Sequence, residues 1–346
     1  MKKKEQVQEP NIQEVADVEA VPVSEQNIVF KPNAGPQTDF LAAGEREVLY
    51  GGSAGGGKSY AMLADPLRYM GHPSFSGLLL RHTTEELREL IYKSKEIYPQ
   101  IWKGIKWSER KMQWEAPSGA RLWMSYLDRE DDVLRYQGLA FSWIGFDELT
   151  QWATPYAWNY MRSRLRSVAS DLPVYMRATT NPGGPGHQWV KKMFIDPAPY
   201  GRQFDATDIE SGNILSYPKG HTKSGQPLFK RRFIPARLSD NPYLAETGDY
   251  ETMLLSLPEH QRKQLLEGDW DIKEGAAFTE FDRNIHVIEP FAIPRNWVKF
   301  RACDYGYGSY SGVLWFAVSP DEQIIVYREL YCSKVLAADL ADMILD

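Results

Sequence analysis

Cysteine is scarce in this sequence, and long apolar runs are missing. The 346 residues include two cysteines, Cys303 and Cys332, which is too few for a disulfide framework or a metal-ligand cluster. No apolar run approaches the ~20 residues that a membrane-spanning helix needs, and the N-terminus lacks the apolar core of a secretion signal. The sequence therefore predicts no membrane partner, and its few cysteines fit a reducing cytoplasm.

An excess of basic residues is missing as well. The net charge is −6, and residues 1–27 carry −3 of it through six acids and three lysines. The remaining residues therefore also carry −3. A protein that coats nucleic acid passively presents a basic field, so the charge disfavours that class. It does not exclude a motor that grips DNA in a restricted channel.

The composition itself is that of a soluble globular protein, with 43% apolar and 25% charged residues. Residues 1–27 have no sustained period, and we expect a disordered tail there. Residues 28–270 alternate apolar strand patterns with amphipathic helix patterns, which predicts an α/β domain. The expected strands are 47–50, 77–81, 121–126, 141–146 and 174–179, and the expected helices are 60–70, 155–166 and 250–266.

Two later regions differ in character. Residues 211–242 are polar, and we interpret them either as a solvated loop or as a loop that faces DNA or a partner. Their basic residues are Lys219, Lys223, Lys230, Arg231, Arg232 and Arg237. We expect a linker at 271–294 and a second unit at 295–346, with strands at 298–304, 312–318 and 323–331 and a helix from 335. This unit has too little sequence to bury its own core, so we expect an incomplete domain.

A glycine-rich loop after the first expected strand carries the strongest chemical signal. Residues 52–59 read Gly-Ser-Ala-Gly-Gly-Gly-Lys-Ser, a phosphate-binding loop (Walker A) when it stands between a strand and a helix. The backbone N–H groups of such a loop hold phosphate oxygens, its lysine reaches the β- and γ-phosphates, and its serine holds Mg²⁺. The residues expected to bind nucleotide are Gly52, Gly55, Gly56, Gly57, Lys58 and Ser59.

An acidic pair ends another apolar strand. Phe141–Phe146 precedes Asp147 and Glu148, and the run suits a buried parallel strand. An acid in this position (Walker B) organises Mg²⁺ through water, so Asp147 is the predicted metal partner. The next acid suits a general base that polarises the attacking water. The pair therefore predicts a hydrolase rather than a nucleotide sensor.

Three polar features complete the expected nucleotide site. The Gln37 amide has the paired donor and acceptor that read an adenine edge. Thr180 and Asn181 end a later strand, where they are placed to sense the γ-phosphate and to relay its loss. Hydrolysis also needs a positive charge on the γ-phosphate. Arg135 is our first choice, and the other candidates are Arg81, Arg162 and Arg164.

The second unit carries one clearly placed acid. Asp304 lies on its first strand, and Glu329 on its third faces either the same site or solvent. A strand-borne aspartate in a meander is how ribonuclease-H-like nucleases begin, and these enzymes hold two Mg²⁺ or Mn²⁺ with several carboxylates. A lone aspartate at a strand end more often has no function, so position alone makes Asp304 only a candidate catalytic residue and metal ligand.

Together these residues resemble the large terminase subunit of tailed bacteriophages, over some nine-tenths of the chain from about Gln37. The order and spacing of the motifs carry the resemblance, because the phosphate loop alone is specific. The matching segments are Pro36–Thr38 (adenine), Gly52–Ser59 (phosphates), Asp147-Glu148 (catalysis), Thr179–Pro182 (coupling), Asp240–Tyr243, Leu265–Trp270 (the end of the ATPase region) and Asp304 (nuclease).

The resemblance implies a P-loop ATPase with a RecA-like, mostly parallel sheet, followed by the start of a ribonuclease-H-like nuclease domain. It implies a motor that uses ATP and Mg²⁺ to move double-stranded DNA into the procapsid, and an endonuclease that cuts concatemers in the full-length protein. The implied partners are the portal protein, the small terminase subunit and further copies of the chain in a ring. The implied location is the host cytoplasm and transiently the procapsid portal, not the mature virion.

Two departures and two alternatives accompany this interpretation. The family's later nuclease acids lie beyond residue 346, so we expect this chain to be a poor nuclease. The family's arginine finger often comes from a neighbouring subunit, so Arg135 rests on position alone. A helicase-like translocase without a capsid would lack the second sheet. A non-hydrolysing assembly protein that binds nucleotide as a structural ligand would not need Glu148.

Overall fold

The computed structural model describes residues 28–272, 286–307 and 310–345. Its chain divides into two compact units, Met1–Gly275 and Ala276–Asp346, and each is described by itself. The predicted tail at 1–27 and the part of the predicted linker at 273–285 lie outside the described residues. No helix in the described part of the chain combines the length and apolar character needed to cross a bilayer.

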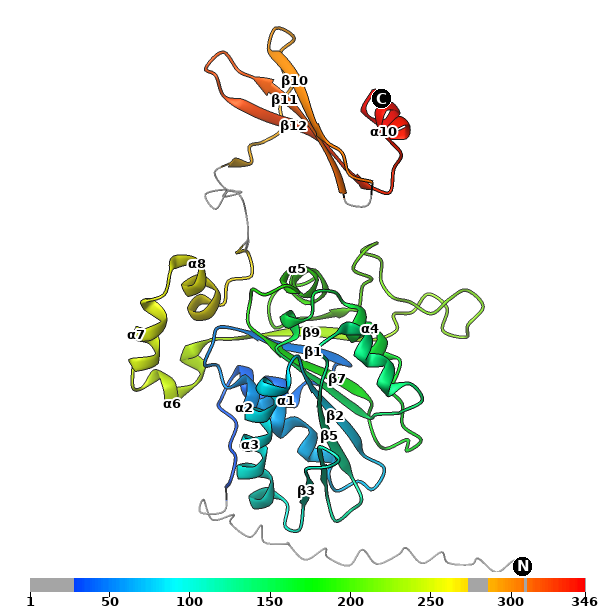
Figure 1. The fold of residues 1–346 in the computed structure, drawn as a ribbon, viewed down its shortest axis with the longest axis vertical. Helices are drawn as coiled ribbons and strands as arrows, with labels where there is room; N and C mark the ends of the chain where they lie inside the picture. The colour runs from blue at the N-terminus through cyan, green and yellow to red at the C-terminus, as the bar shows by residue number, and fades with distance from the viewer. Residues whose placement is uncertain (1–27, 273–285, 308–309, 346) are drawn as a thin grey trace, which may run out of the picture. The chain divides into compact units, whose positions relative to one another are not determined.

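A nine-stranded sheet forms the centre of the first unit, in the order β3-β4-β5-β2-β6-β7-β1-β9-β8 (Figure 1). Parallel pairing joins β5, β2, β6, β7, β1 and β9, whereas β3, β4 and β8 add antiparallel edges. The carboxyl ends of the parallel strands share one edge, where open α/β sheets bind ligands. The strands are β1 (Glu47–Gly52), β2 (Ser76–Arg81), β3 (Lys106–Ser108), β4 (Gln113–Glu115), β5 (Arg121–Tyr126), β6 (Trp143–Asp147), β7 (Tyr175–Thr180), β8 (Gln203–Asp205) and β9 (Lys230–Ala236).

Helices precede, connect and follow these strands. The α-helices are α1 (Pro36–Ala42), α2 (Lys58–Ala64), α3 (Thr84–Ile101), α4 (Tyr156–Arg162), α5 (His187–Val190), α6 (Pro242–Ala245), α7 (Asp249–Leu255) and α8 (Glu259–Arg262). The 3₁₀ turns are Asp65–Tyr69, Glu130–Tyr136, Leu149–Gln151 and Leu238–Asp240, and single π turns extend α5 over Lys191–Ile195 and α8 over Lys263–Glu267.

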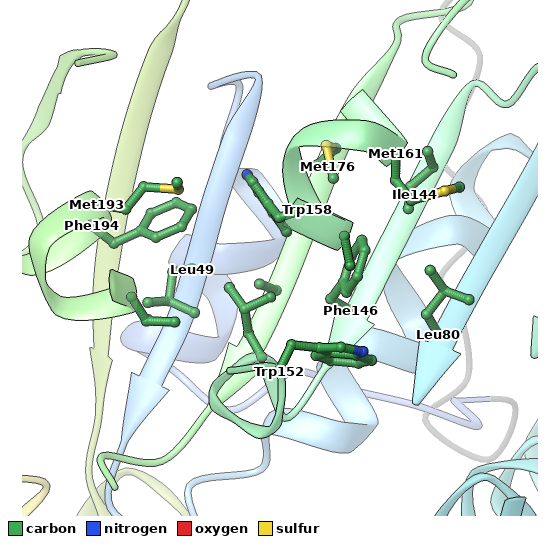
Figure 2. Close-up of a cluster of buried hydrophobic side chains, with 14 of the residues drawn as sticks. Leu49, Leu80, Ile144, Phe146, Trp152, Trp158, Met161, Met176, Met193 and Phe194 are labelled. Atoms are coloured by element: carbon green, nitrogen blue, oxygen red, sulfur yellow. The ribbon is translucent and has the colours of Figure 1, made fainter. Parts of the chain in front are cut away.

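Different helices cover the two faces of the sheet. Leu49 and Phe146 point to one face, where they pack with Trp158 of α4 in a large hydrophobic cluster (Figure 2). Leu79 points to the opposite face and packs with Leu90 of α3. Since successive strand residues point to opposite faces, a strand covered on both sides must be apolar throughout. This explains why the central strands read as unbroken apolar runs.

The predicted α/β fold with a mostly parallel sheet is confirmed. The five expected strands appear as β1, β2, β5, β6 and β7, with ends within two residues of the expected ones. Differences of this size are usual at element ends, where the last residues fray.

One expectation for this unit is wrong. We expected a loop throughout 211–242, but Lys230–Ala236 forms β9 beside β1. Its basic residues suggested solvent exposure, yet Arg231 is buried and its Nε lies 2.7 Å from Oε2 of Glu47 on β1. A buried charge is tolerated when it is paired and hydrogen-bonded. The loop interpretation holds for the earlier part, where Lys219 and Lys223 are exposed.

Helix α3 was not expected, although its sequence carries a start signal. The Thr83 hydroxyl accepts a hydrogen bond from the Glu86 N–H, and the Glu86 carboxylate accepts one from the Thr83 N–H. A threonine followed three residues later by glutamate is this capping box, and it marks a helix N-terminus.

The second unit is a three-stranded antiparallel sheet in the order β10-β11-β12 with one helix. Its elements are β10 (Val298–Asp304), β11 (Tyr310–Val318), β12 (Ile324–Ser333) and α10 (Ala337–Leu345). One face of β11 places Val313 and Trp315 against Leu340 of α10. The three strands lie where we expected them, with ends within two residues of the expected ones.

Candidate active site

The predicted phosphate loop lies between β1 and α2. Gly52 has φ +139°, and a Cβ there would lie 2.3 Å from the Ala236 carbonyl oxygen. Only glycine fits this close approach of two strands. Lys58 is the first residue of α2, is buried, and donates from Nζ to the Ser53 carbonyl oxygen at 2.6 Å. The loop thus leads into a helix N-terminus, where free N–H groups favour anions.

Three successive carbonyls of the loop are tethered by side chains from three segments. Gly55 accepts from the Asn241 amide at 2.7 Å, Gly56 from the Tyr50 hydroxyl at 2.7 Å, and Gly57 from the Gln37 amide at 2.9 Å. In a trans peptide the N–H points away from the C=O. The tethers therefore turn the next N–H group of each peptide toward the opposite side of the loop, as a phosphate cradle requires.

Gln37 reaches the nucleotide loop but is already hydrogen-bonded. Its Nε2 donates to Gly57, and its Oε1 accepts from the Asn33 N–H at 2.7 Å. Each amide group keeps one further donor or acceptor position, so the predicted contact with adenine stays open to it. Asn241 is a second side chain that contacts the loop, and we did not predict it as a site residue. The sequence feature that could have identified it is the segment Asp240–Tyr243, which resembles an element of the terminase family.

The acidic pair lies where β6 ends. Asp147 is fully buried, and its Oδ1 accepts a hydrogen bond from the Thr179 hydroxyl on β7. Glu148 adopts the left-handed conformation, with φ 59° and ψ 57°, and a 3₁₀ turn follows at Leu149–Gln151. This conformation costs a residue other than glycine about 1–2 kcal/mol. Strain of this kind is concentrated at functional sites, where the surrounding structure holds it.

Electrostatics link the loop lysine to the acidic pair. Burial raises the pKa of the Glu148 carboxyl, and the charge of Asp147 raises it further, against the opposing effects of Lys58 and Arg81. Burial lowers the pKa of the Lys58 ammonium, against the opposing effects of the two carboxylates. These groups therefore interact with one another across the site. A carboxyl whose pKa is shifted toward neutrality suits a general base.

Thr180 and Asn181 contact the turn that carries the acidic pair. The Thr180 and Thr150 hydroxyls lie 2.7 Å apart, and the Thr150 hydroxyl also donates to the Asn181 carbonyl at 3.2 Å. A backbone hydrogen bond from Asn181 lowers the pKa of Glu148. Asn181 Oδ1 is buried without a hydrogen-bond partner among the described residues. The end of β7 is thus joined to Glu148, which suits the predicted relay.

The residues predicted to hold Mg²⁺ fit such an ion. Asp147 Oδ2 is buried, and among the described residues it faces the Arg81 Nε at 3.2 Å but accepts no aligned hydrogen bond. In the described ranges no three His, Cys, Asp or Glu side chains gather as a metal cluster. Mg²⁺ at nucleotide sites takes most ligands from water and phosphates and only one or two from protein. Asp147 and the Ser59 hydroxyl, in the first turn of α2, meet this need.

Three of the four candidate arginines are engaged elsewhere. Arg135, our first choice, donates from Nη2 to the Tyr126 carbonyl at 2.6 Å. Arg162 pairs with Glu47 at the start of β1, the end opposite the phosphate loop. Arg164 lies over an aromatic ring. Arg81, by contrast, ends β2 with its Nε 3.2 Å from Asp147 Oδ2. The fold therefore brings Arg81 to the acidic pair and not the other three.

The segment Leu265–Trp270 returns to the phosphate loop. The Ala54 N–H donates to the Leu265 carbonyl at 2.6 Å. Gly268 has φ +66°, and a Cβ there would lie 2.6 Å from the Ser53 nitrogen. The close approach of two backbones explains the glycine. The segment Leu265–Trp270 therefore supports the phosphate loop that follows β1.

In the second unit, Asp304 and Glu329 share one face of the sheet. Asp304 pairs with Gly312, which pairs with Tyr331 on β12. Paired residues of antiparallel strands point to the same face, and Glu329 lies two residues before Tyr331. The register thus favours the first of our two interpretations of Glu329.

Known proteins resemble this chain in sequence and fold. Residues 49–285 match a family model described as terminase large subunit, T4likevirus-type, N-terminal. A structure of the large terminase from a thermophilic bacteriophage is similar over 91% of this chain and 73% of its own, with 16% identity and a TM-score of 0.51. Another structure of that protein, in complex with ADP, has 16% identity, the same coverage and a TM-score of 0.48.

The large terminase ATPase domain of a Thermus phage is similar over 71% of this chain and 96% of its own, with 13% identity and a TM-score of 0.45. Of these three structures, the one with the TM-score of 0.51 supports the fold. No curated protein matches the sequence.

Proposed function

Since this chain belongs to the family of terminase large subunits, we propose that it is the ATP-hydrolysing motor that moves double-stranded viral DNA into the procapsid. The observation that carries the proposal is the pair formed by the buried Asp147 and the half-buried Glu148, which interacts electrostatically with the buried Lys58. A protein that only bound nucleotide would need the phosphate loop but no base with a raised pKa. The pair therefore favours hydrolysis.

Each group at the nucleotide site has a proposed role that follows from its position. The loop N–H groups and Lys58 bind the phosphates, and Gln37 contacts the base. Mg²⁺ held by Ser59 and Asp147 would supply charge neutralisation on the phosphate oxygens. Glu148 orients the attacking water and accepts its proton. Because Thr150, Thr180 and Asn181 bond to one another beside Glu148, a change at the γ-phosphate would move the end of β7.

The second unit supports a further role in cutting DNA. Asp304 and Glu329 lie on one face of its sheet, as the first acids of a ribonuclease-H-like site that uses Mg²⁺ or Mn²⁺ would. The portal protein, the small terminase subunit and a ring of copies are the proposed partners. The proposed location is the host cytoplasm, transiently at the procapsid portal and outside the mature virion.

ATP turnover with and without double-stranded DNA tests the proposal. We expect Mg²⁺-dependent hydrolysis that DNA stimulates, and protection of DNA from nuclease when procapsids with portal are added. Hydrolysis without any DNA protection would favour a translocase that works without a capsid. Absence of hydrolysis under all these conditions would contradict the proposal.

A further inference from the structure

Arg81 is positioned by the register of two neighbouring strands. Strands β2 and β6 run parallel, and Leu80 pairs with Phe146. The next residues along the two strands are Arg81 and Asp147, and both strands end there. The same edge carries the phosphate loop after β1. The fold therefore places an arginine of the same chain at the nucleotide site.

The side chain of Arg81 is nearly buried but its donors are unused. It is 11% exposed, and its Nε lies 3.2 Å from Asp147 Oδ2 without the alignment of a hydrogen bond. No hydrogen bond from its guanidinium to any described residue is present, although an arginine has five donors. Thr179 already occupies the other oxygen of Asp147. The terminal nitrogens of Arg81 therefore lack an acceptor within the described part of the chain.

The other buried arginines of this unit behave differently. Arg177 donates its terminal nitrogens to the carbonyls of Ala43 and Glu45 at 2.6 and 3.0 Å. Arg231 donates to the Thr207 carbonyl at 2.7 Å in addition to its carboxylate partner. These two arginines, which lie away from the site, thus donate their terminal N–H groups to backbone carbonyl oxygens. Arg81 departs from this pattern at the one edge of the sheet where an anion is expected.

We propose that Arg81 is the cis-acting arginine of the nucleotide site, whose Nε forms an ion pair with Asp147 and whose terminal nitrogens bind γ-phosphate oxygens. A planar fork of N–H groups matches phosphate in a way that a lysine ammonium does not. The inference rests on the proposed ATPase function. It replaces Arg135 in this role, because Arg135 is held by the Tyr126 carbonyl.

The reaction step balances without a proton from Arg81. The water oxygen forms a bond to the γ-phosphorus while the bond from that phosphorus to the bridging oxygen breaks. The water proton passes to Glu148, and ADP leaves with the bridging oxygen. Arg81 stays protonated and stabilises negative charge on the γ-oxygens, as catalytic arginines do in phosphoryl transfer.

Two substitutions at Arg81 test the proposal, with Arg164→Gln as the matched control because that arginine only covers a ring and bonds a neighbouring serine. We expect Arg81→Gln to lower kcat by about a hundredfold or more, since removing one stabilising donor has effects of this size. We expect Arg81→Lys to keep the wild-type melting temperature yet lose about tenfold or more in kcat. In direct binding, both variants should bind ATPγS about tenfold more weakly and ADP as tightly as wild type.

The outcomes separate this inference from the proposed function. A wild-type protein without ATP turnover would remove the premise, whereas active wild type with an equally active Arg81→Lys variant would overturn the role of Arg81. Equal losses of ATPγS and ADP binding in both variants would indicate a structural ion pair and also overturn it. Mixing Arg81→Gln with Lys58→Ala protein should not restore turnover. Recovery on mixing would mean that Arg81 acts in trans, which contradicts the proposal.

Discussion

At the scale of single residues, the site brings opposite charges into one buried space. Burial and Asp147 raise the pKa of Glu148, while Lys58 and Arg81 oppose that rise. Buried charges are stable only as compensated sets. Substitutions in this set therefore affect nucleotide binding and turnover in ways that depend on which charge is removed.

Glu148→Gln should separate binding from turnover. The amide keeps the shape of the side chain but cannot accept the water proton, so we expect kcat to fall by about a hundredfold or more. Nucleotide affinity should be retained, because the phosphate loop is unchanged. Steady-state hydrolysis and direct ATPγS titration measure the two quantities, and turnover near the wild-type rate would refute the base assignment.

Lys58→Ala, unlike Glu148→Gln, should weaken nucleotide binding. Its ammonium is the charged donor of the phosphate loop, and charged hydrogen bonds contribute about 1.5–3 kcal/mol. We expect nucleotide affinity to fall by about tenfold to a hundredfold in calorimetric titration. Unchanged affinity would show that Lys58 does not reach the phosphates.

The ion pairs of Glu47 with Arg162 and Arg231, at the end of β1 opposite the phosphate loop, can be tested through the pH dependence of stability. Burial alone would raise its pKa, but Arg162 and Arg231 together outweigh burial and lower it below the ordinary value of 4.5. A carboxyl with a lowered folded pKa contributes stability above its unfolded pKa and loses it as pH falls through the folded pKa. Wild-type stability should therefore decrease below about pH 4.5.

The variant Glu47→Gln removes the carboxylate, and with it both the ion pairs to Arg162 and Arg231 and the pH dependence of stability that they cause. We expect it to be less stable by about 3–5 kcal/mol at neutral pH, because the buried Arg231 and the half-buried Arg162 both lose their partner. Its free energy of unfolding should also change less between pH 5 and pH 3, as urea titrations can measure. Glu109→Gln is the control, since its ion pair lies at the surface, and a loss of similar size there would contradict the argument.

At the scale of elements, the return of Leu265–Trp270 to the phosphate loop has a clean test. Gly268 and Gly248 have nearly the same φ, +66° and +67°, but only at Gly268 would a Cβ meet another backbone, that of Gly52 and Ser53. Gly268→Ala should therefore weaken ATPγS binding in addition to straining its own turn. Gly248→Ala should have only the backbone cost of about 1–2 kcal/mol in stability. Equal nucleotide affinity in the two variants would contradict a supporting role for the segment.

Local signals predicted most elements but not all. Strands β1, β6 and β7 were evident because a strand covered on both faces must be apolar. β9 was not predicted, because a basic residue such as Arg231 usually indicates a surface position. In the fold it is buried and paired with Glu47, which is distant in sequence. Helix α3 carried a readable capping box. A partner distant in sequence, unlike a cap, leaves no local pattern.

At the scale of the whole molecule, the two units have separate cores. Because the second unit buries only a small apolar cluster among its described residues, we expect calorimetry to show its unfolding as a weak, early transition, and only the main transition of the first unit should respond to nucleotide with Mg²⁺. Ligand at a hundred times Kd stabilises its binding unit by about 2.7 kcal/mol. The shift should vanish with EDTA or in Lys58→Ala. A single transition that shifts as a whole would indicate that the units unfold together.

The sequence by itself determined the fold class and the main chemical groups. Gly52–Ser59, Asp147 and Glu148 are recognisable from their spacing, because each lies at the end of an apolar strand. Only the tertiary structure decided which arginine meets them. The choice depends on the order of strands in the sheet, which places β2 beside β6 and so brings Arg81 to Asp147. Strand order is set by packing between distant segments, and no local pattern records it.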